Sequence, residues 1–330
     1  MSNPDVAVVI VTYKCAPLTI ACLASIQAER AAHKLAIRVI VVDNASGDQP
    51  QIERAVTRNN WSSWVTLVPA PINGGFAYGN NLGIYHAYQR GRPAFIHLLN
   101  PDTQVRPSGI ASLVEFLGSH PQVGIAGSSF ETADGTPWPF AFRFPTLFSE
   151  LDRGLQVALV TRLLSRWTVA KNMSSAAQPT DWISGASMMI RPNVFETIGT
   201  LDENFFLYFE ETEFCHRALK AGFSTWYVPS SRVMHMIGQS TNLDDEARAS
   251  KPLPTYWFES RRRYYATTHS TAYAALCDVI AIVSGLMGHV KRLLQHRSGT
   301  PHFVRDLFRH SALWPKNWTV SPLKCYFPRR

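Results

Sequence analysis

The repeated alternation of apolar, β-branched segments with helical segments constrains the fold of this chain most. Residues 6–13 form a continuous apolar run, and residues 17–27 open with a proline, which a helix tolerates in its first turn. The same order recurs with expected strands at 37–43, 65–68 and 95–99 and expected helices at 50–59 and 79–90. Strands that are apolar throughout are typical of parallel sheets covered on both faces. The sequence therefore predicts an α/β fold with a mainly parallel, Rossmann-like sheet flanked by helices.

The second half of the chain has a less regular pattern. A further strand is expected at 123–130, an amphipathic helix at 150–167, an apolar, strand-like run at 183–190 and a short strand at 224–228. The strict order of strand and helix seen in the first half is not kept here.

Length and composition allow a sizeable core and favour a reducing environment. With 330 residues, of which 46% are hydrophobic, the chain suits one large domain or two small ones. The five cysteines are odd in number and include no Cys-x-x-Cys pair, so disulfides and structural zinc are not expected. The first apolar run has the length of a strand and ends at Thr12, so no signal peptide is expected. We therefore expect a cytoplasmic protein.

The positive charge is concentrated in the last forty residues. Residues 291–330 carry nine Lys and Arg and one acid, Asp306, so this tail accounts for the whole net charge of +8. Nucleic-acid binding would need a basic face on the folded body, so no nucleic-acid partner is expected. A basic tail that follows the apolar segment 272–290 suits an anionic membrane surface instead.

The segment 272–290 is apolar, but Asp278, Ser284 and His289 interrupt it. A spanning helix needs about 20 mainly apolar residues. We therefore interpret the segment as an amphipathic or buried helix, which as an amphipathic helix would suit attachment to a membrane surface. A packed helix with a solvated end is the alternative that the sequence leaves open.

Polar residues follow four of the expected strands at the point where each strand ends. In chain order they are Thr12 and Tyr13, Asp43, Asn73 with Gly74 and Gly75, and Asn100 with Asp102. Each alone is as typical of a turn or a cap. Ligands of an open parallel sheet bind outside the carboxyl ends of its strands, so four such endings on one rim indicate a ligand site. Asp43 is placed there to accept a hydrogen bond from a ribose hydroxyl or a pyrimidine N–H.

These residue types suit a phosphorylated ligand and a divalent cation. Asp102 offers a hard oxygen ligand for Mg²⁺ or Mn²⁺, which stabilises the negative charge of a diphosphate. Gly74 and Gly75 permit the backbone to approach a base or phosphate closely. Asn73 and Asn81 offer amide groups beside them.

Four motifs together resemble those of family 2 glycosyltransferases. They are AVVIVTY at 7–13, VVDNAS at 41–46, NGGFAYGNN at 73–81 and LNPD at 99–102. The similarity covers about residues 5–265, includes 143–146 and 184–186, and is greatest to bacterial rhamnosyltransferase-like members. It implies a GT-A fold and a nucleotide diphosphate sugar donor. It also implies that Asp102 is the remaining metal ligand of an Asp-X-Asp motif in which Asn100 replaces the first Asp.

A second cluster places five carboxylates among aromatic residues at 202–213. A solvated, acid-rich helix start is the simpler interpretation, but the interleaved aromatic side chains argue against solvation. Inverting transfer needs a carboxylate base to take the acceptor proton. The segment resembles the family's Glu-Asp motif, and we expect Glu211 to be the base. Glu210 and Glu213 would bind the acceptor or orient the base, and either could hold that role instead.

Further residues are expected on the acceptor or metal side. His235 stands where family members often place a third metal ligand, although a lone His is more often structural. Trp182 could stack on a sugar face or pack in the core, and Ser184 and Gly185 belong to a motif named above. Arg261 could contact a diphosphate or a lipid-linked phosphate, with a solvated charge run as the alternative.

The resemblance implies an inverting, metal-dependent glycosyltransferase of cell-envelope polysaccharide or glycolipid synthesis. We expect a dTDP- or UDP-sugar donor, with L-rhamnose from dTDP-rhamnose as the leading candidate, and a polysaccharide or lipid-linked glycan acceptor. A GT-A catalytic domain is expected at 1–265, with a nucleotide-sugar-binding half at 1–130 and an acceptor-binding half at 131–265. A helical, basic extension is expected at 266–330, in contact with the inner face of the cytoplasmic membrane.

Two other classes remain as alternatives. A nucleotidyltransferase acting on sugar phosphates usually shows a Gly-rich, basic signature after the first strand, which residues 12–16 lack. A non-catalytic nucleotide-sugar binding module would not need both Asp102 and the Glu210–Glu211 pair.

Overall fold

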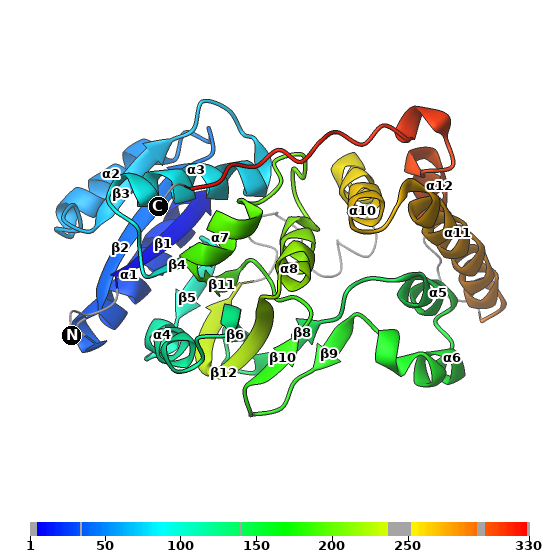
Figure 1. Cartoon of the computed structure of the whole chain (residues 1–330), viewed down its shortest axis with the longest axis horizontal. Helices are drawn as coiled ribbons and strands as arrows, with labels where there is room; N and C mark the ends of the chain where they lie inside the picture. The colour runs from blue at the N-terminus through cyan, green and yellow to red at the C-terminus, as the bar shows by residue number, and fades with distance from the viewer. Residues whose placement is uncertain (1–4, 34, 139, 237–251, 296–300, 329–330) are drawn as a thin grey trace.

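The first half of the chain alternates strands and helices, as the sequence predicts. The computed structural model describes residues 5–33, 35–138, 140–236, 252–295 and 301–328. The elements of this half (Figure 1) are β1 (Asp5–Thr12), α1 (Ala16–His33), β2 (Ala36–Asp43), α2 (Gln49–Arg58), β3 (Val65–Pro69), α3 (Gly75–Gln89) and β4 (Phe95–Leu99). β1 lies between β2 and β4 and is parallel to both, and β2 is parallel to β3. The predicted parallel α/β arrangement is confirmed.

The second half extends the same sheet with strands of both directions. Its elements here are β5 (Thr103–Val105), α4 (Gly109–Ser119), β6 (Val123–Glu131), β7 (Pro137–Trp138), β10 (Gln178–Thr180), β11 (Ser187–Ile190), α7 (Pro192–Ile198), α8 (Glu210–Lys220) and β12 (Ser224–His235). The order across the sheet is β10-β12-β6-β11-β4-β1-β2-β3. β11 is antiparallel to β4 and β6, whereas β6 and β12 are parallel. β12 continues beyond the expected short strand and carries His235 to its end.

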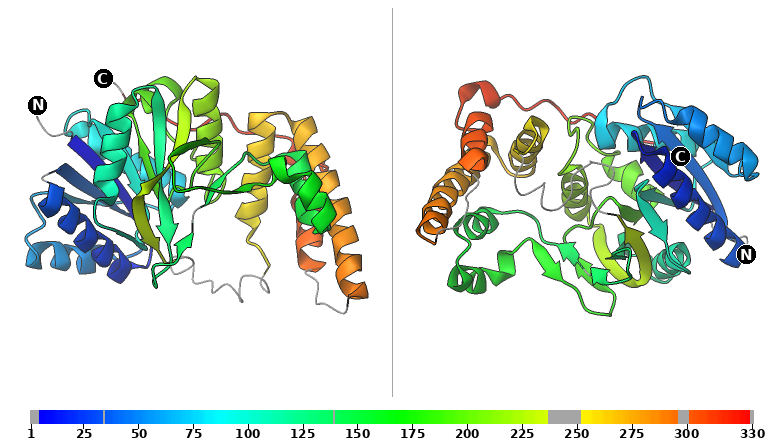
Figure 2. Two further views of the ribbon diagram at one scale, coloured as in Figure 1. Left: turned by 90° about the horizontal axis from the view of Figure 1, so that it is seen from below. Right: turned by 180° about the vertical axis from the view of Figure 1, so that it is seen from behind.

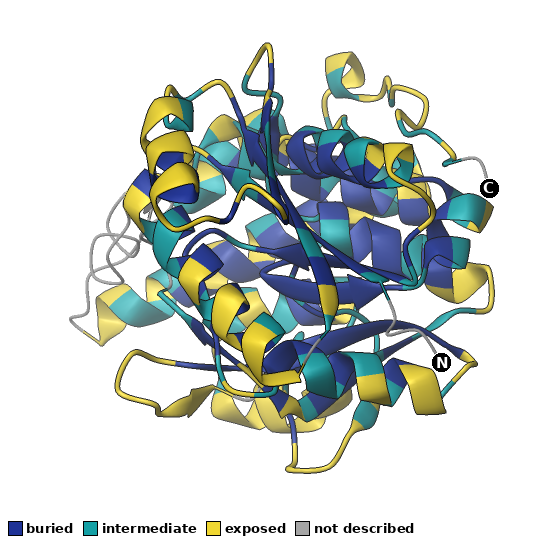
Figure 3. Cartoon of the chain, turned by 90° about the vertical axis from the view of Figure 1, so that its left-hand side faces the viewer, coloured by how far each residue is buried: buried dark blue, intermediate teal, exposed yellow. Residues whose placement is uncertain are grey.

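Two hydrophobic layers form because successive side chains of a strand point to opposite faces of the sheet. Val6, Val8 and Ile10 of β1 join a cluster with residues of α1, α2 and α4. Ala7 and Val9 join a second cluster with residues of α3, α7 and α8. Figure 3 shows buried strands between helices whose outer sides are exposed. This packing fixes the sheet rigidly and leaves the loops at the strand ends to form the site.

The single helix expected at 150–167 is broken, so that prediction was wrong. α5 (Leu147–Leu155) ends just before Gln156, whose φ of 51° is left-handed. α6 (Ala158–Leu163) and a 3-10 turn (Ser165–Trp167) follow. A residue with positive φ cannot continue a right-handed helix. Upstream and downstream of this region, β8 (Phe140–Phe142) and β9 (Ala170–Asn172) pair as a small separate sheet.

Three helices pack with α5 at one end of the molecule (Figures 1 and 2). They are α10 (Thr255–Thr268), α11 (Thr271–Leu294) and α12 (Pro301–His310), and α11 contacts α5, α10 and α12. The chain then returns to the sheet domain, where Thr200 N donates to Tyr326 O at 2.9 Å and Glu203 N donates to Lys324 O at 2.9 Å. The last residues therefore hold the loop that precedes α8.

Candidate active site

The ends of β1 and β2 lie side by side, because Thr12 and Asp43 are partners in the parallel register. Thr12 is fully buried, and its hydroxyl donates to Asp48 Oδ2 at 3.2 Å. The same carboxylate oxygen accepts from Cys15 N at 2.7 Å. The expectation that Thr12 contacts the donor is therefore wrong, since its side chain ties two loops together. Tyr13 is exposed at this rim and remains a candidate for contact with a ligand.

The Asp43 carboxylate is buried and organises the loop after β2. Its Oδ1 accepts from Ser46 N at 2.9 Å and from Ser46 Oγ at 2.5 Å, and its Oδ2 accepts from Gln49 N at 3.2 Å. These bonds fix the start of α2. A contact between Asp43 and a nucleoside stays a prediction.

Gly74 and Gly75 stand at the start of α3, and Gly75 allows a close contact between two backbone segments of the protein. Gly75 has a φ of +87°, and a Cβ built on it would lie 2.0 Å from the carbonyl oxygen of Phe206. The next residue, Phe76, donates its N–H to that same oxygen at 2.8 Å. The approach that requires glycine in this structure is to the 200–209 loop, and an approach to a base or phosphate stays a prediction. At Gly74, an added Cβ would meet the Tyr78 ring.

Asn73 and Asn81, two of the three asparagines of this motif, are engaged within the protein. Asn73 Oδ1 accepts from Asn44 Nδ2 at 2.9 Å. Asn81 is fully buried, donates to Leu201 O at 2.8 Å and accepts from Leu201 N at 3.1 Å. Asn81 therefore anchors the 200–209 loop on α3, and its predicted contact with the donor is wrong.

The loop after β4 and the end of β12 bring Asp102 and His235 together. Asp102 Oδ1 lies 3.4 Å from His235 Nε2, because the antiparallel pairing of β5 with β12 places Thr103 opposite His235. Asn100 precedes Asp102 by two residues. Its side-chain Oδ1 is buried and has no hydrogen-bond partner among the residues that the structure describes. Within those residues, no group of three or more His, Cys, Asp or Glu is arranged to hold a metal. The carboxylate of Asp102 and the imidazole of His235 would supply two ligands to a divalent cation, and the other ligands would have to come from elsewhere.

Glu210 and Glu211 open α8, as the sequence predicts for a helix start. Burial, and then the charge of Glu211, raises the pKa of Glu210 well above its ordinary value of 4.5. Burial also raises the pKa of Glu211, although backbone N–H groups, including that of Gly185, act in the opposite direction. Glu210 is the more deeply buried of the two side chains, and Glu211 is the one that lines a cavity.

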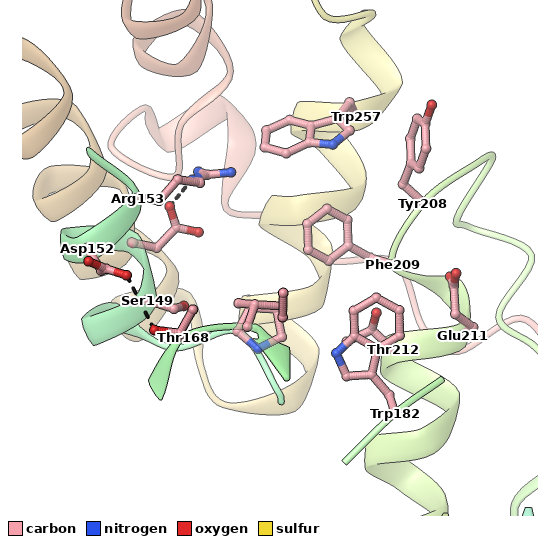
Figure 4. A pocket seen from close by; sticks show the side chains of 14 residues that line it. Ser149, Asp152, Arg153, Thr168, Trp182, Tyr208, Phe209, Glu211, Thr212 and Trp257 are labelled. Carbon is pink, nitrogen blue, oxygen red and sulfur yellow. Dashed lines mark hydrogen bonds and ion pairs between the residues drawn. The ribbon is translucent and has the colours of Figure 1, made fainter. Parts of the chain in front are cut away.

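Glu211 lines a cavity of about 490 Å³ between α5, α8 and α10. Figure 4 shows Trp182, Phe209 and Trp257 as its aromatic walls, with Arg153 on the side away from Glu211. Trp182 stacks on Phe142 with ring centroids 4.2 Å apart and donates its indole N–H to Arg143 O at 2.9 Å. Its position in the cavity wall agrees with the expected acceptor side, whereas its stacking partner is protein.

Backbone contacts connect the loop of Asp102 to the base. Asn100 N donates to Ala186 O at 3.0 Å. Gly185, one residue earlier, donates its N–H toward Glu211, and a Cβ on Gly185 would lie 3.9 Å from the Glu211 Cβ. Ser184 is turned into its own loop, where its Oγ accepts from Ala186 N at 3.2 Å. The 184–186 motif therefore joins the presumed metal side of the site to the carboxylate side.

Two expected acceptor contacts are wrong because both side chains are buried elsewhere. Glu213 is paired with Arg217 at 2.6 Å, and Arg217 donates to Thr200 O at 2.9 Å. Arg261 is 1% exposed and is held by ion pairs with Glu150, at 3.1 Å, and with Asp278. Neither lines the cavity, and neither is the solvated charge that the alternative interpretations proposed.

Several cavity residues were not found from the sequence. Arg153, Phe209 and Trp257 come from three separate elements that only the packing of α5 and α10 around α8 brings together. The role of Asp48 was missed as well, because its carboxylate does not cap α2 and instead accepts hydrogen bonds from Thr12 and Cys15 of the distant first loop.

Comparisons with known proteins identify the fold and the family. A mannosyltransferase from Pyrobaculum calidifontis, solved with GDP-Man and Mn²⁺, superposes with a TM-score of 0.55 at 15% identity over 96% of this chain and 83% of that one. The fold is thus that of the GT-A glycosyltransferases. Residues 4–263 match the family described as "Glycosyltransferase like family 2", and the chain belongs to that family.

Two curated relatives extend this assignment. The N-acetylglucosaminyl-diphospho-decaprenol L-rhamnosyltransferase of Mycobacterium tuberculosis is 30% identical over 77% of this chain and 84% of its own length. The low-salt glycan biosynthesis hexosyltransferase Agl10 of Haloferax volcanii is 28% identical over 68% of this chain and 63% of its own length. These relatives support a transferase that acts in glycan synthesis.

Proposed function

We propose that this chain transfers a sugar with inversion and that Glu211 is the general base. Glu211 takes the proton of an acceptor hydroxyl, whose oxygen attacks the anomeric carbon of the donor sugar. A new glycosidic C–O bond forms as the bond to the diphosphate breaks, and the nucleotide diphosphate leaves with the bonding electrons. The supporting observation is that Glu211, and not Glu210, lines a cavity large enough for a sugar, with the Gly185 N–H directed at it.

The donor is proposed to lie against residues 1–130 and the acceptor against 131–265. L-rhamnose from dTDP-rhamnose is the leading donor, in keeping with the name of the mycobacterial relative, and a UDP-sugar is the alternative. Asp102 and His235 would hold Mg²⁺ or Mn²⁺, and a cation there would stabilise the charge of the departing diphosphate. The proposed acceptor is a polysaccharide or a lipid-linked glycan, the latter being the kind that the same relative's name prints.

A metal requirement is tested at Asp102, which is 1% exposed. Asp102→Asn keeps the size of the side chain but removes its charge, so we expect lost turnover and weakened donor binding with an unchanged far-UV spectrum. Asp134→Asn removes an exposed carboxylate and is the matched control. Isothermal titration with dTDP-rhamnose and UDP-sugars, with and without Mn²⁺, measures the effect. Full wild-type turnover in excess chelator would refute the requirement.

We further propose that the enzyme is cytoplasmic and attaches peripherally to the inner face of the cytoplasmic membrane through α11. This helix is long and apolar enough to cross a membrane by length and composition. Its packed side carries small or polar residues, namely Ala274, Cys277, Asp278, Ala281, Ser284, Gly285 and Gly288. Its exposed large side chains are Leu276, Val279, Val283, Leu286, Met287, Val290, Leu293 and Leu294.

This distribution is the reverse of that in a helix on the surface of a water-soluble domain, where large apolar side chains face the core. Asp278 faces inward because it pairs with Arg261, and this fixed pairing argues against insertion of α11 as a spanning helix. The next charged residues, Lys291 and Arg292, lie in its last turn, where they suit anionic headgroups. If α11 lies at the membrane surface, its exposed apolar side contacts lipid while its small and polar side stays packed against the protein.

A further inference from the structure

Arg153 of α5 lies where three cavities meet. It lines the cavity of about 490 Å³ that contains Glu211, and also two neighbours of about 190 Å³ and 730 Å³. The smaller neighbour lies between α5, α11 and α12, and Arg292 lines it. The larger one is lined by Arg162 of α6. Arg153 therefore lies between the cavity of the proposed base and the helices proposed to face the membrane, and "the path" below means this line of neighbouring cavities.

The Arg153 guanidinium is held in place yet keeps donors for a ligand. One of its nitrogens lies 2.5 Å from Glu150 Oε2, and its side chain is 44% exposed. The guanidinium carbon lies 5.5 Å from the ring centroid of Trp257 and 5.2 Å from that of Phe303. A guanidinium has five N–H donors, so the single contact with Glu150 leaves others to face the cavity. Aromatic rings and an ion pair limit the entropy that binding would cost.

The charge of Glu150 does not cancel the charge of Arg153, because Glu150 has a second cation. Arg261 Nε lies 3.1 Å from Glu150 Oε1, and Tyr265 donates to the same oxygen at 2.7 Å. Although burial opposes its ionisation, Arg153 and Arg261 lower the pKa of Glu150 to about 2. Asp152 is the other nearby acid in the cavity wall, and it accepts hydrogen bonds from Thr161, at 2.6 Å, and Thr168. Arg153, Arg162 and Arg292 thus leave the far end of the path basic.

We infer that the acceptor carries a phosphate or diphosphate and that Arg153 binds it while the acceptor sugar lies between Trp182 and Glu211. The inference rests on the proposed function and names the chemistry of the acceptor. A bidentate guanidinium fork recognises such an anion well, and the aromatic walls suit a sugar ring. The phosphate stays on the acceptor throughout, so it is a recognition element and not a leaving group. Arg153 takes the role that the sequence had suggested for the buried Arg261.

The test is binding of geranyl diphosphate to the full chain by isothermal titration, with Mn²⁺ and saturating dTDP so that the donor site is filled. We expect wild type to bind and Arg153→Gln to bind about tenfold or more weakly, the loss typical of one charge-assisted hydrogen bond. Arg153→Lys, which keeps the charge but not the fork, should fall between them. Arg166→Gln is the matched control, because Arg166 is exposed nearby over the Trp167 ring at 3.8 Å.

Two further ligands identify what is recognised. Inorganic diphosphate tests binding of the anion alone, and geraniol tests binding of the prenyl group alone. If inorganic diphosphate binds as tightly as geranyl diphosphate, the site takes free phosphates, and if only the prenyl compound binds, the site takes a lipid-linked one. Binding by geraniol equal to that by geranyl diphosphate, or no difference between Arg153→Gln and wild type, would overturn the inference.

Failure of the inference is distinguishable from failure of the proposed function. Arg153→Gln leaves Glu150 with Arg261 and Tyr265, so the fold and the donor site should survive. Thermal unfolding of Arg153→Gln should therefore match wild type, and hydrolysis of the sugar nucleotide is compared between wild type and the control Arg166→Gln. If neither protein binds or hydrolyses any sugar nucleotide, the proposed function fails. If the sugar nucleotide is bound and hydrolysed normally but Arg153→Gln binds geranyl diphosphate as tightly as wild type does, only the acceptor inference fails.

Discussion

Glu210 and Glu211 are adjacent carboxylates with different environments. Glu210 is 2% exposed, while Glu211 is partly exposed in the cavity wall. Two nearby carboxylates do not ionise together easily in a site with little water, so one holds a proton while the other is charged. In the proposed mechanism Glu211 carries the charge, while burial keeps Glu210 protonated beside it.

This assignment predicts opposite behaviour of two amide variants. Glu211→Gln should keep donor affinity and lower kcat roughly a hundredfold or more, because a general base acts in the chemical step. Glu210→Gln resembles the protonated acid already present, so its kcat at neutral pH should stay near that of wild type. Steady-state kinetics with matched donor-binding titrations measure both. A dead Glu210→Gln with an active Glu211→Gln would reverse the assignment.

The pH dependence has a defined sign. The base works deprotonated, so kcat should rise with pH through the pKa of Glu211 and fall as pH drops below it. Burial raises this pKa above 4.5, so the acid limb should lie above that of an ordinary glutamate.

At the scale of residues, the sequence indicates which motifs lie near the candidate site, but it does not indicate which of their side chains point into it. Asp102 lies beside His235 after β4, and Glu211 lines a cavity at the start of α8, while their roles stay predictions. Asn81 and Arg261 turn inward because distant segments, the 200–209 loop and α11, supply their partners. Burial of this kind depends on tertiary contacts that no local pattern records.

At the scale of elements, the close contact of α3 with the 200–209 loop couples the donor side to the helix that carries the base. Phe76 N–H and the glycine beside it meet the Phe206 carbonyl. The same loop is held by Asn81 from α3 and by the returning terminal segment at Glu203. The position of Glu211 therefore depends on this contact.

The contact predicts a large difference between two glycine substitutions. Gly75→Ala places a Cβ against the Phe206 carbonyl, whereas Gly91→Ala, with a φ of +99°, has no atom within 4 Å of the added Cβ. Both cost about 1 kcal/mol or somewhat more from their positive φ, so any further loss in Gly75→Ala reports the contact. We expect a clearly lower unfolding temperature and kcat for Gly75→Ala alone. Equal unfolding temperatures of the two variants would show that the 200–209 loop can move away from the added Cβ without loss of stability.

Element prediction succeeds where burial gives a simple pattern. The strands β1 to β4 are apolar throughout, because helices cover both faces, and the sequence indicates each of them. The antiparallel β11 and the break after α5 do not follow from local pattern. β11 reaches its place between β4 and β6 through long-range pairing, and Gln156 takes a left-handed conformation without a glycine to signal it.

At the scale of the whole molecule, α11 supports one wall of the cavity that contains Glu211 from behind, because it packs against α5. α11 supplies Asp278 to Arg261, which supports Glu150 and through it Arg153. The terminal segment also contacts Asp202, where Lys324 N donates to Oδ1 at 3.0 Å. Removing everything after residue 270 would therefore disturb the acceptor cavity, and point variants are the better test of membrane attachment.

The proposed attachment predicts a specific loss of vesicle binding. Leu286→Glu with Val290→Glu changes two outward side chains of α11, each at least half exposed, while Leu219→Glu changes a similarly exposed leucine on α8. In sedimentation with phosphatidylglycerol vesicles, only the α11 variant should lose binding. Salt should weaken wild-type binding without abolishing it, since each basic residue contributes about 1 kcal/mol that ions screen. Equal sedimentation of all three proteins would contradict the proposal.

The most direct test of the central claim is the anomeric configuration of the product. A screen of nucleotide sugars for thermal stabilisation selects the donor, and NMR of the product formed on a lipid-linked acceptor gives the configuration of the new bond. A single displacement with Glu211 as base predicts a glycoside of opposite configuration to the donor, and almost none from Glu211→Gln. A product that retains the configuration, or one that forms equally well with Glu211→Gln, would contradict the account.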